Sequence, residues 1–359
     1  MPPEPIWAFS LKDERRVGAR APVIDGDALY QIFYYDRGNS SESVCIALDI
    51  LTGTERWRFV ISHVANEPVV GSDGMIYVSS FEGLIYAIDR HGALRWKAPD
   101  SHRNLGMVSL VGPDRIAVAE TGGGAGKTWC LDAQTGQALW SFDSGGHSYR
   151  IAATRDLLVH ASVIGKFEST AIRLFALSAK DGRPLWVASH DEYLFRPVVH
   201  DDLVIIGARG SVLAYALATG KVVARLELPE GSAATTLVAT GGGALAIDDE
   251  AMLRLLAVKR ERSLFRSTVR LEQIWQVALE EEGVGHPLEL GGRIMVLTKG
   301  GAILVFSRDD GRQLGSHRPK KGMSGAGGLT RSGPVLVQAS GRTVRLFHVT
   351  DFLPDEVLW

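Results

Sequence analysis

The stretch that decides the fold runs from Ala47 to Trp57 and reads Ala-Leu-Asp-Ile-Leu-Thr-Gly-Thr-Glu-Arg-Trp. A short apolar run ends at Asp49, a Thr-Gly pair follows, and Trp57 comes four residues after Gly53. Asp and Thr side chains hydrogen-bond turn backbone, and Gly supplies the positive φ that such turns need. We therefore expect a strand, a tight turn and a second strand, whose tryptophan fills the gap to a neighbouring sheet.

The same pattern returns along the chain. Further copies, some of them decayed, lie at residues 87–96, 131–140, 176–186, 216–225 and 305–314, and another ends at Trp275 after an insertion. In the fifth copy Arg225 stands near the place of the tryptophan. The first four tryptophans of this series are 39, 44 and 46 residues apart, a period typical of the four-stranded blades of β-propellers.

One copy shows the order of strands within a blade. Residues 68–70 open strand A, residues 75–78 form strand B, and residues 84–89 form strand C. Strand D carries Leu94 and Trp96. Gly- and Asp-containing turns separate these β-branched and aromatic runs, as in antiparallel hairpins.

The ends of the chain predict how the last blade closes. Residues 6–9 (Ile-Trp-Ala-Phe) match residues 139–142 (Leu-Trp-Ser-Phe), the start of a strand D. Residues 327–349 supply strands A to C without a full strand D. We therefore predict that the N-terminal strand completes the last blade and removes its open edge. The result is an all-β, eight-bladed propeller of four-stranded antiparallel blades in a single domain, 1–359. A competing closure uses residues 357–359.

Composition excludes several classes of function. The net charge is −2 with a pI near 6.6, which does not favour general nucleic-acid binding. No apolar run approaches the length of a membrane span, so we expect no membrane insertion. The first residues show neither a signal peptide nor a lipid-attachment cysteine, so we expect a cytoplasmic protein. A closed propeller needs no oligomer to hide edges, which predicts a monomer.

The Ala-x-Asp-x-x-Thr-Gly-x-x-x-Trp pattern resembles the pyrroloquinoline quinone (PQQ)-like repeat family over essentially the whole chain. The family includes quinoprotein alcohol dehydrogenases, a propeller lipoprotein of outer-membrane β-barrel assembly, and sensor or scaffold domains. The dehydrogenases carry vicinal cysteines above the quinone, together with acidic and amide ligands for calcium. Here Cys45 and Cys130 stand on different repeats, in apolar runs typical of buried residues. We therefore expect no cofactor.

Motifs for catalysis or metal binding are weak. Residues 121–128 (Thr-Gly-Gly-Gly-Ala-Gly-Lys-Thr) look like a phosphate-binding loop, with Thr121 in place of the first glycine. Such a loop must open a helix, whereas Lys127 and Thr128 lead directly into a strand C. We interpret the segment as a hairpin loop. There is no His-x-x-x-His or Cys-x-x-Cys pair to hold metal, and we expect no catalytic residues.

Loop positions just before each strand A converge on one face of a propeller, around its channel. The residues expected at this channel mouth are Arg20, Glu67, Arg150, Arg196 and His286, with Tyr149 and Tyr193 beside them. A mostly basic cluster of this kind suits an acidic peptide, a phosphate or a carboxylate. A solvated rim without a ligand is the alternative.

Two insertions lengthen the minimal blade, at residues 34–43 and 259–270. The second extends the C–D connection of the sixth repeat and carries Lys259, Arg260, Arg262, Phe265 and Arg266. Extra loops on rigid scaffolds often carry recognition. We therefore predict a non-catalytic scaffold or adaptor that binds a protein partner through the channel mouth and this projection. The alternatives are a small-ligand or anion sensor and a quinoprotein-type enzyme.

Overall fold

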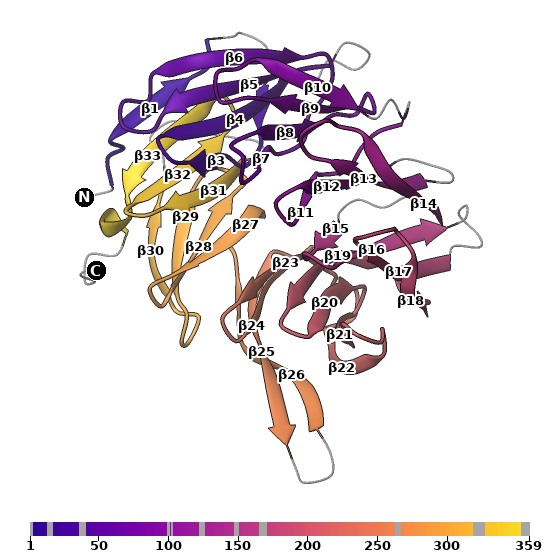
Figure 1. The fold of residues 1–359 in the computed structure, drawn as a ribbon. Coiled ribbons are helices and arrows are strands. Elements are labelled where there is room, and N and C mark those ends of the chain that lie inside the picture. Colours follow the sequence, from indigo (N-terminus) through magenta and orange to yellow (C-terminus); the bar gives the residue numbers. More distant parts are fainter. Residues whose placement is uncertain are drawn as a thin grey trace. The chain divides into compact units, whose positions relative to one another are not determined.

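The computed structural model describes residues 3–12, 17–35, 41–98, 101, 103–121, 126–146, 151–164, 171–262, 267–318 and 327–352. In these ranges the chain is an eight-bladed β-propeller of antiparallel sheets, with one short 3-10 turn at Val349–Asp351 (Figure 1). The described part contains no helix whose length and apolarity would let it span a bilayer. The predicted fold class is thus confirmed.

The blades fall into two compact units of four. One unit joins Met1–Lys97 to Glu281–Trp359 and holds blades 1, 2, 7 and 8. The other is the continuous segment Ala98–Glu280 with blades 3 to 6. The single domain expected from the repeats stays a prediction.

The strands of the first unit follow the repeat. Blade 1 comprises β2 Val17–Ala19, β3 Val23–Asp25, β4 Ala28–Tyr35, β5 Glu42–Asp49 and β6 Glu55–Ile61. Blade 2 comprises β7 Val69–Val70, β8 Ile76–Ser79, β9 Ile85–Ile88 and β10 Leu94–Ala98. Blade 7 comprises β27 Gly283–Leu290, β28 Arg293–Thr298, β29 Ile303–Ser307 and β30 Gln313–His317. Blade 8 comprises β31 Gly327–Ser332, β32 Val335–Ser340, β33 Thr343–His348 and β1 Trp7–Ser10.

The second unit continues the same order. Blade 3 comprises β11 Ser109–Val111, β12 Arg115–Ala119, β13 Gly126–Asp132 and β14 Ala138–Gly146. Blade 4 comprises β15 Ile151–Ala153, β16 Leu157–Ile164, β17 Ala171–Ser178 and β18 Pro184–His190. Blade 5 comprises β19 Leu194–His200, β20 Leu203–Ala208, β21 Ser211–Ala216 and β22 Val222–Glu227. Blade 6 comprises β23 Ala234–Thr240, β24 Gly243–Asp248, β25 Met252–Arg262 and β26 Ser267–Ala278.

The N-terminal strand closes the last blade. β1 pairs antiparallel with β33, from Trp7 opposite Leu346 to Ser10 opposite Thr343. Blade 8 therefore combines strands from both ends of the sequence, as predicted. Residues 357–359, which the competing closure would use, lie outside the described residues.

The apolar pattern explains how blades stack. The middle strands, such as β8 and β9, are buried along their whole length, whereas the outer strand β18 alternates exposed and half-buried residues. Within each unit, middle strands of adjacent blades pack face to face, and each of these blade interfaces has its own core. In one of these cores Leu174 of blade 4 meets Val204 and Leu213 of blade 5.

The repeat residues join one blade to the next. Each indole Nε1 donates to a carbonyl in the C–D turn of the following blade in the pairs Trp7 with Ile50, Trp57 with Arg90, Trp140 with Ala179 and Trp186 with Leu217. The glycine of each turn lies under the ring. This confirms the structural interpretation of the repeat. In blade 5 the place of the tryptophan belongs to Ala224, opposite Ala214, and not to Arg225.

Candidate functional site

Prolines lie just before strand A or in a bulge within it in several blades. Pro22, Pro68, Pro197 and Pro287 follow Ala21, Glu67, Arg196 and His286 in blades 1, 2, 5 and 7. A proline donates no ladder hydrogen bond, so it is tolerated at a strand start or in a bulge. The regular ladder therefore breaks beside three of the residues that the sequence analysis selected.

Bulges follow from this break. In blade 5 the pairing steps from Leu194 opposite Ala208 to Pro197 opposite Ile206, which leaves Phe195 and Arg196 against the single residue Gly207. β23 of blade 6 has a similar irregularity at Thr235, and β27 of blade 7 has one at residues 285–287, which include His286. A bulge unpairs residues and redirects their side chains, often next to functional sites.

The blade 5 bulge opens onto a cavity of about 200 Å³. We call it the Tyr193 cavity; it is lined by Ala161, Val163, Tyr193, Leu194, Phe195, Arg196 and Thr235. The rings of Tyr193 and Phe195 meet edge to face, with centroids 5.1 Å apart. Two predicted site residues, Tyr193 and Arg196, are thus brought together.

Close backbone packing holds the Tyr193 cavity in place. The backbone N–H of Arg209 donates to the carbonyl of Tyr193 at 3.3 Å. A Cβ on Gly207 would lie 1.9 Å from the carbonyl oxygen of Ala234, so only glycine lets the first strand of blade 6 approach this closely. The cavity therefore lies where two blades meet at backbone contact.

Arg196 gives the Tyr193 cavity its charge. The residue is half-buried, and the described residues offer it no hydrogen bond or ion pair. A guanidinium beside apolar and aromatic walls suits a carboxylate that arrives with an apolar group. The arrangement can bind; it holds no nucleophile with an adjacent base.

Three other predicted channel residues, Arg20, Glu67 and His286, lie in the first unit. Arg20 donates from Nε to the carbonyl of Ala65 at 2.9 Å, and its Cζ lies 4.5 Å from the ring centroid of Tyr34. Arg20 is thus engaged in joining blades 1 and 2. Glu67 and His286 are half-buried. Tyr149, Arg150, Phe265 and Arg266 lie outside the described residues.

The 259–270 insertion is a strand extension. β25 and β26 stay paired out to Arg262 opposite Ser267, and Figure 1 shows them running well past β23 and β24. Lys259 is exposed, opposite Arg270. We call the paired segment 258–271, with its turn, the blade 6 hairpin.

The blade 6 hairpin is tied to blade 5. Arg260 pairs with Asp202 and lies 4.0 Å from Asp201, both in the β19–β20 turn. The hydrogen bond to Asp202 raises the pKa of Arg260, and the same bond lowers the pKa of Asp202. The hairpin is therefore anchored near its base.

The loop-like stretch 121–128 leads into a strand of blade 3. Lys127 and Thr128 lie in β13, and the Lys127 amide donates to Glu120 at 3.0 Å, so the loop-like stretch leads into a hairpin strand as expected. Residues 122–125 lie outside the described residues.

The cysteines do not fit a quinone site. Cys45 in β5 and Cys130 in β13 are buried in different units. Burial raises the pKa of Cys45 to about 12 and that of Cys130 to about 11, which keeps both as thiols. In the part of the chain that the structure describes, no three His, Cys, Asp or Glu side chains form a metal-binding group.

Sequence reasoning missed some of this geometry. Phe195 and Thr235 line the Tyr193 cavity, but only the bulges direct them there. The Arg-Pro and His-Pro pairs were a usable signal for the bulges of blades 5 and 7. No sequence motif indicated a second cavity, which lies between blades 1 and 2.

Comparisons with known proteins agree with the repeat. A family model described as outer membrane protein assembly factor BamB matches residues 4–141 and 82–270. Outer membrane protein assembly factor BamB of Nitrosomonas eutropha (strain DSM 101675 / C91 / Nm57) is 27% identical over 143 residues, or 40% of this chain and 32% of that protein. The match thus spans about a third of the length of that relative.

Solved structures share the fold. BamB from Moraxella catarrhalis has a TM-score of 0.66 at 16% identity, over 96% of this chain and 99% of that one. The computationally designed Ika8 protein has a TM-score of 0.71 at 12% identity, over 95% of this chain and 98% of that one. Quinohemoprotein alcohol dehydrogenase ADHIIG from Pseudomonas putida HK5 has a TM-score of 0.68 at 13% identity, over 96% of this chain and 76% of that one. At these identities the likeness shows the fold alone. Because the family model matches most of the chain, the protein belongs to the PQQ-like repeat β-propeller family of the outer membrane protein assembly factor BamB.

Proposed function

We propose that this propeller is a non-catalytic scaffold that binds a protein partner through the Tyr193 cavity. The observation that carries the proposal is Arg196, which is half-buried on a bulge, without a partner among the described residues, beside two aromatic rings. The family supports a binding role, because its model and its curated relative are both named as assembly factors.

The lining of the Tyr193 cavity suits one anchoring side chain of a partner. Binding hot spots are rich in Tyr and Arg and cluster in pockets that lose their water on binding. An apolar partner residue would fill the space beside Tyr193 and Phe195, and a neighbouring carboxylate would pair with Arg196. The bulge lies in a packed strand, so little ordering is needed on binding.

The blade 6 hairpin is proposed as a second contact. It projects beyond its blade, exposes Lys259, and is held at its base by Arg260. A projection that is held at its base adds contact area at a lower entropic cost than a free loop.

The test is affinity capture from cells that make the chain, followed by binding measurements with the captured partner. Arg196→Glu should abolish capture, because a carboxylate would then face a carboxylate. Arg183→Glu is the matched control, since Arg183 is an exposed residue in the C–D turn of blade 4 and does not line the cavity. Equal capture by both variants would refute the role of the cavity.

The hairpin is tested separately. Replacing residues 260–269 by Asn-Gly joins Lys259 to Arg270, which already face each other, through the loop that two-residue hairpins prefer. We expect weaker but measurable binding. Unchanged affinity would remove the hairpin from the proposal and leave the cavity.

A small-ligand or anion sensor is the competing function. The unpartnered Arg196 favours it, but a volume of about 200 Å³ lies below the ~300–1,000 Å³ usual for ligand pockets. A thermal-shift screen against phosphate, short carboxylates and nucleotides distinguishes the two. A shift that Arg196→Ala abolishes would favour the sensor.

Compartment and assembly are part of the proposal. We propose a monomer in the cytoplasm, whereas the curated relative is named for the outer membrane. Fractionation of the native host with an antibody to the chain tests the compartment. Light scattering of the purified protein tests the mass.

A further inference from the structure

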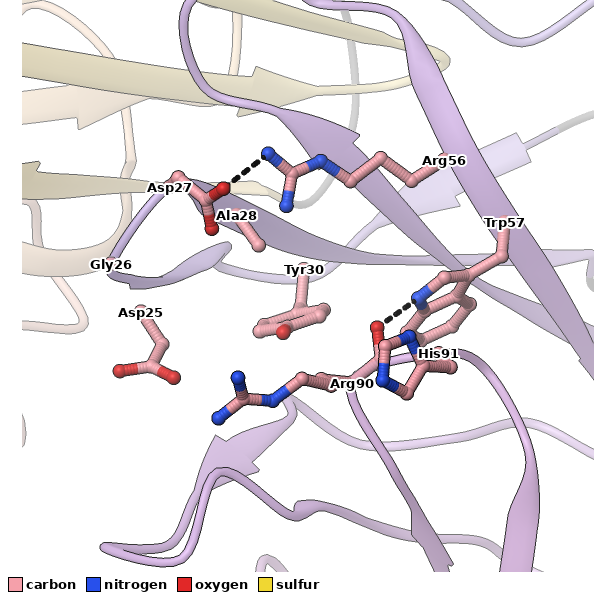
Figure 2. A pocket seen from close by; sticks show the side chains of 9 residues that line it. All are labelled: Asp25, Gly26, Asp27, Ala28, Tyr30, Arg56, Trp57, Arg90 and His91. Atoms are coloured by element: carbon pink, nitrogen blue, oxygen red, sulfur yellow. Dashed lines mark hydrogen bonds and ion pairs between the residues drawn. The ribbon is translucent and has the colours of Figure 1, made fainter.

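A second cavity, of about 520 Å³, lies between blades 1 and 2 within one unit (Figure 2). The A–B turn of blade 1 contributes Asp25 and Asp27, the strands behind it contribute Tyr30, Arg56 and Trp57, and the C–D turn of blade 2 contributes Arg90 and His91. We call it the Arg90 cavity. Its volume falls within the usual range for small ligands.

One wall of the Arg90 cavity is an internally satisfied ion triad. Arg56 donates to Asp27 at 2.8 Å and to Asp49 at 2.7 Å. The hydrogen bond from Arg56 is the main cause that lowers the pKa of Asp49 to about 2. The triad has a net charge of −1, but each of its three charges is hydrogen-bonded within the protein, so the triad frames the cavity without needing a ligand.

The aromatic wall is equally fixed. Trp57 donates from Nε1 to the carbonyl of Arg90 at 2.8 Å, and a Cβ on Gly92 would lie 2.8 Å from the indole. Tyr30 packs against Trp57 with ring centroids 5.8 Å apart. The repeat contact between blades therefore also holds the turn that carries Arg90.

Two charges in this cavity have no partner among the described residues, Arg90 and Asp25. Figure 2 shows the guanidinium of Arg90 extending toward the carboxylate of Asp25, and no ion pair joins them. Both charges act on Tyr30, which lines the cavity beside Trp57. Burial is the main cause that raises the pKa of Tyr30; the charge of Asp25 raises this pKa further, and the charge of Arg90 lowers it.

Blade 7 has an arginine at the same turn position, and there it is paired. Arg308 is the counterpart of Arg90, because each directly follows the residue whose N–H closes the C–D turn: Ser307 donates to the carbonyl of Arg312, and Asp89 donates to the carbonyl of Ala93. Arg308 pairs with Glu289 on strand A. The register places Val70 at the corresponding position of blade 2. Arg90 therefore lacks the carboxylate that neutralises its counterpart.

We propose that the Arg90 cavity binds a small zwitterion, a free amino acid, whose carboxylate meets Arg90 and whose ammonium meets Asp25. A simple anion would lie beside the carboxylate of Asp25, and a simple cation would lie beside Arg90. A ligand that carries both charges satisfies both residues. The rings of Trp57 and Tyr30 then favour an apolar or aromatic side chain.

This site does not depend on the proposed protein-binding role, since it lies in the other unit from the Tyr193 cavity. Either proposal can fail while the other stands.

Titration calorimetry with phenylalanine, N-acetyl-phenylalanine and phenylalanine amide tests the site on the full chain. Acetylation removes the ammonium charge and amidation removes the carboxylate. We expect free phenylalanine to bind about tenfold more tightly than either capped form, the size of one charge-assisted contact. No heat at millimolar phenylalanine, or equal affinities for the three ligands, would overturn the proposal.

Two variants test which residue binds which charged group of the ligand. Asp25→Asn should erase the preference for phenylalanine over its N-acetyl form, and Arg90→Gln should erase the preference over the amide. Arg95→Gln is the control, because Arg95 pairs with Asp89 in the same C–D hairpin but does not line the cavity. Since Asp25 and Arg90 are exposed, we expect the variants to fold, which thermal unfolding verifies. Preferences that survive in both variants would refute the assignment.

Discussion

The indole Nε1 of Trp186 donates a 2.7 Å hydrogen bond to the carbonyl of Leu217 in the next blade. Gly220 of the same turn lies directly under the ring: a Cβ there would come within 2.4 Å of it. The hydrogen bond and the stacked glycine hold two successive blades at one spacing. Strain at this point should therefore weaken the whole interface.

We expect Gly220→Ala to destabilise the fold by roughly 1–3 kcal/mol beyond the cost of its backbone conformation, because the new methyl group overlaps the indole. Gly210→Ala is the control. Gly210 has a comparable positive φ of 78°, against 67° at Gly220, but its Cβ would meet nothing within 4 Å. Urea unfolding of both variants measures the difference. Equal losses of unfolding free energy in the two variants would mean that the indole moves aside without destabilising the fold.

A buried ion pair inside blade 6 gives a second prediction. Arg254 and Asp248 are almost fully buried and 2.6 Å apart. Replacing Asp248 by Ala leaves the guanidinium uncompensated, and we expect a loss of about 3–5 kcal/mol in unfolding free energy. The double variant Arg254→Met with Asp248→Leu should recover much of this loss, because no buried charge remains. A double variant as unstable as Asp248→Ala alone would contradict this account.

His160 predicts a pH dependence of stability. The residue is fully buried, stacked on Phe175, and burial lowers its pKa to about 4. The unfolded chain binds a proton near the ordinary histidine pKa of about 6.5, where the folded chain does not. The contribution of His160 to the free energy of unfolding is therefore fully present above about pH 6.5. It decreases as the pH drops toward 4, by about 3 kcal/mol at most. His160→Leu should have a flatter unfolding free energy between pH 7 and pH 5. Parallel curves for parent and variant would refute the assignment.

The anchor of the blade 6 hairpin gives a fourth prediction. Asp202→Asn weakens the ion pair with Arg260, and a surface pair of this kind contributes about 0–1 kcal/mol to global stability. We therefore expect nearly unchanged unfolding but faster amide exchange along residues 258–262. Arg270→Gln is the control, since Arg270 pairs with Glu261 inside the hairpin, at 3.6 Å. Equal exchange in both variants would show that the anchor does not restrain the hairpin.

The repeat predicted much of this fold because its residues act locally. Asp49, Gly53 and Trp57 define a turn and the strand after it, and the same chemistry recurs in other blades. The match between residues 6–9 and 139–142 was enough to predict closure by β1.

The sites were less predictable because they arise where the repeat fails. Arg196 and Tyr193 were found by position, but the cavity beside them depends on a bulge that needs two strands to define. Arg20 lies one residue before the matching position and is engaged by Ala65 and Tyr34. The missing partner of Arg90 becomes evident only when blade 2 is compared with blade 7, where Glu289 stands at the position of Val70.

Blade 8 imposes an order on biosynthesis. The strand Trp7–Ser10 is synthesised more than three hundred residues before its partner Thr343–His348. Until then β1 has no edge to join, and a chain halted before β33 keeps both an orphan strand and an incomplete sheet. Completion of this one sheet thus distinguishes a chain that includes β33 from a chain that stops before it.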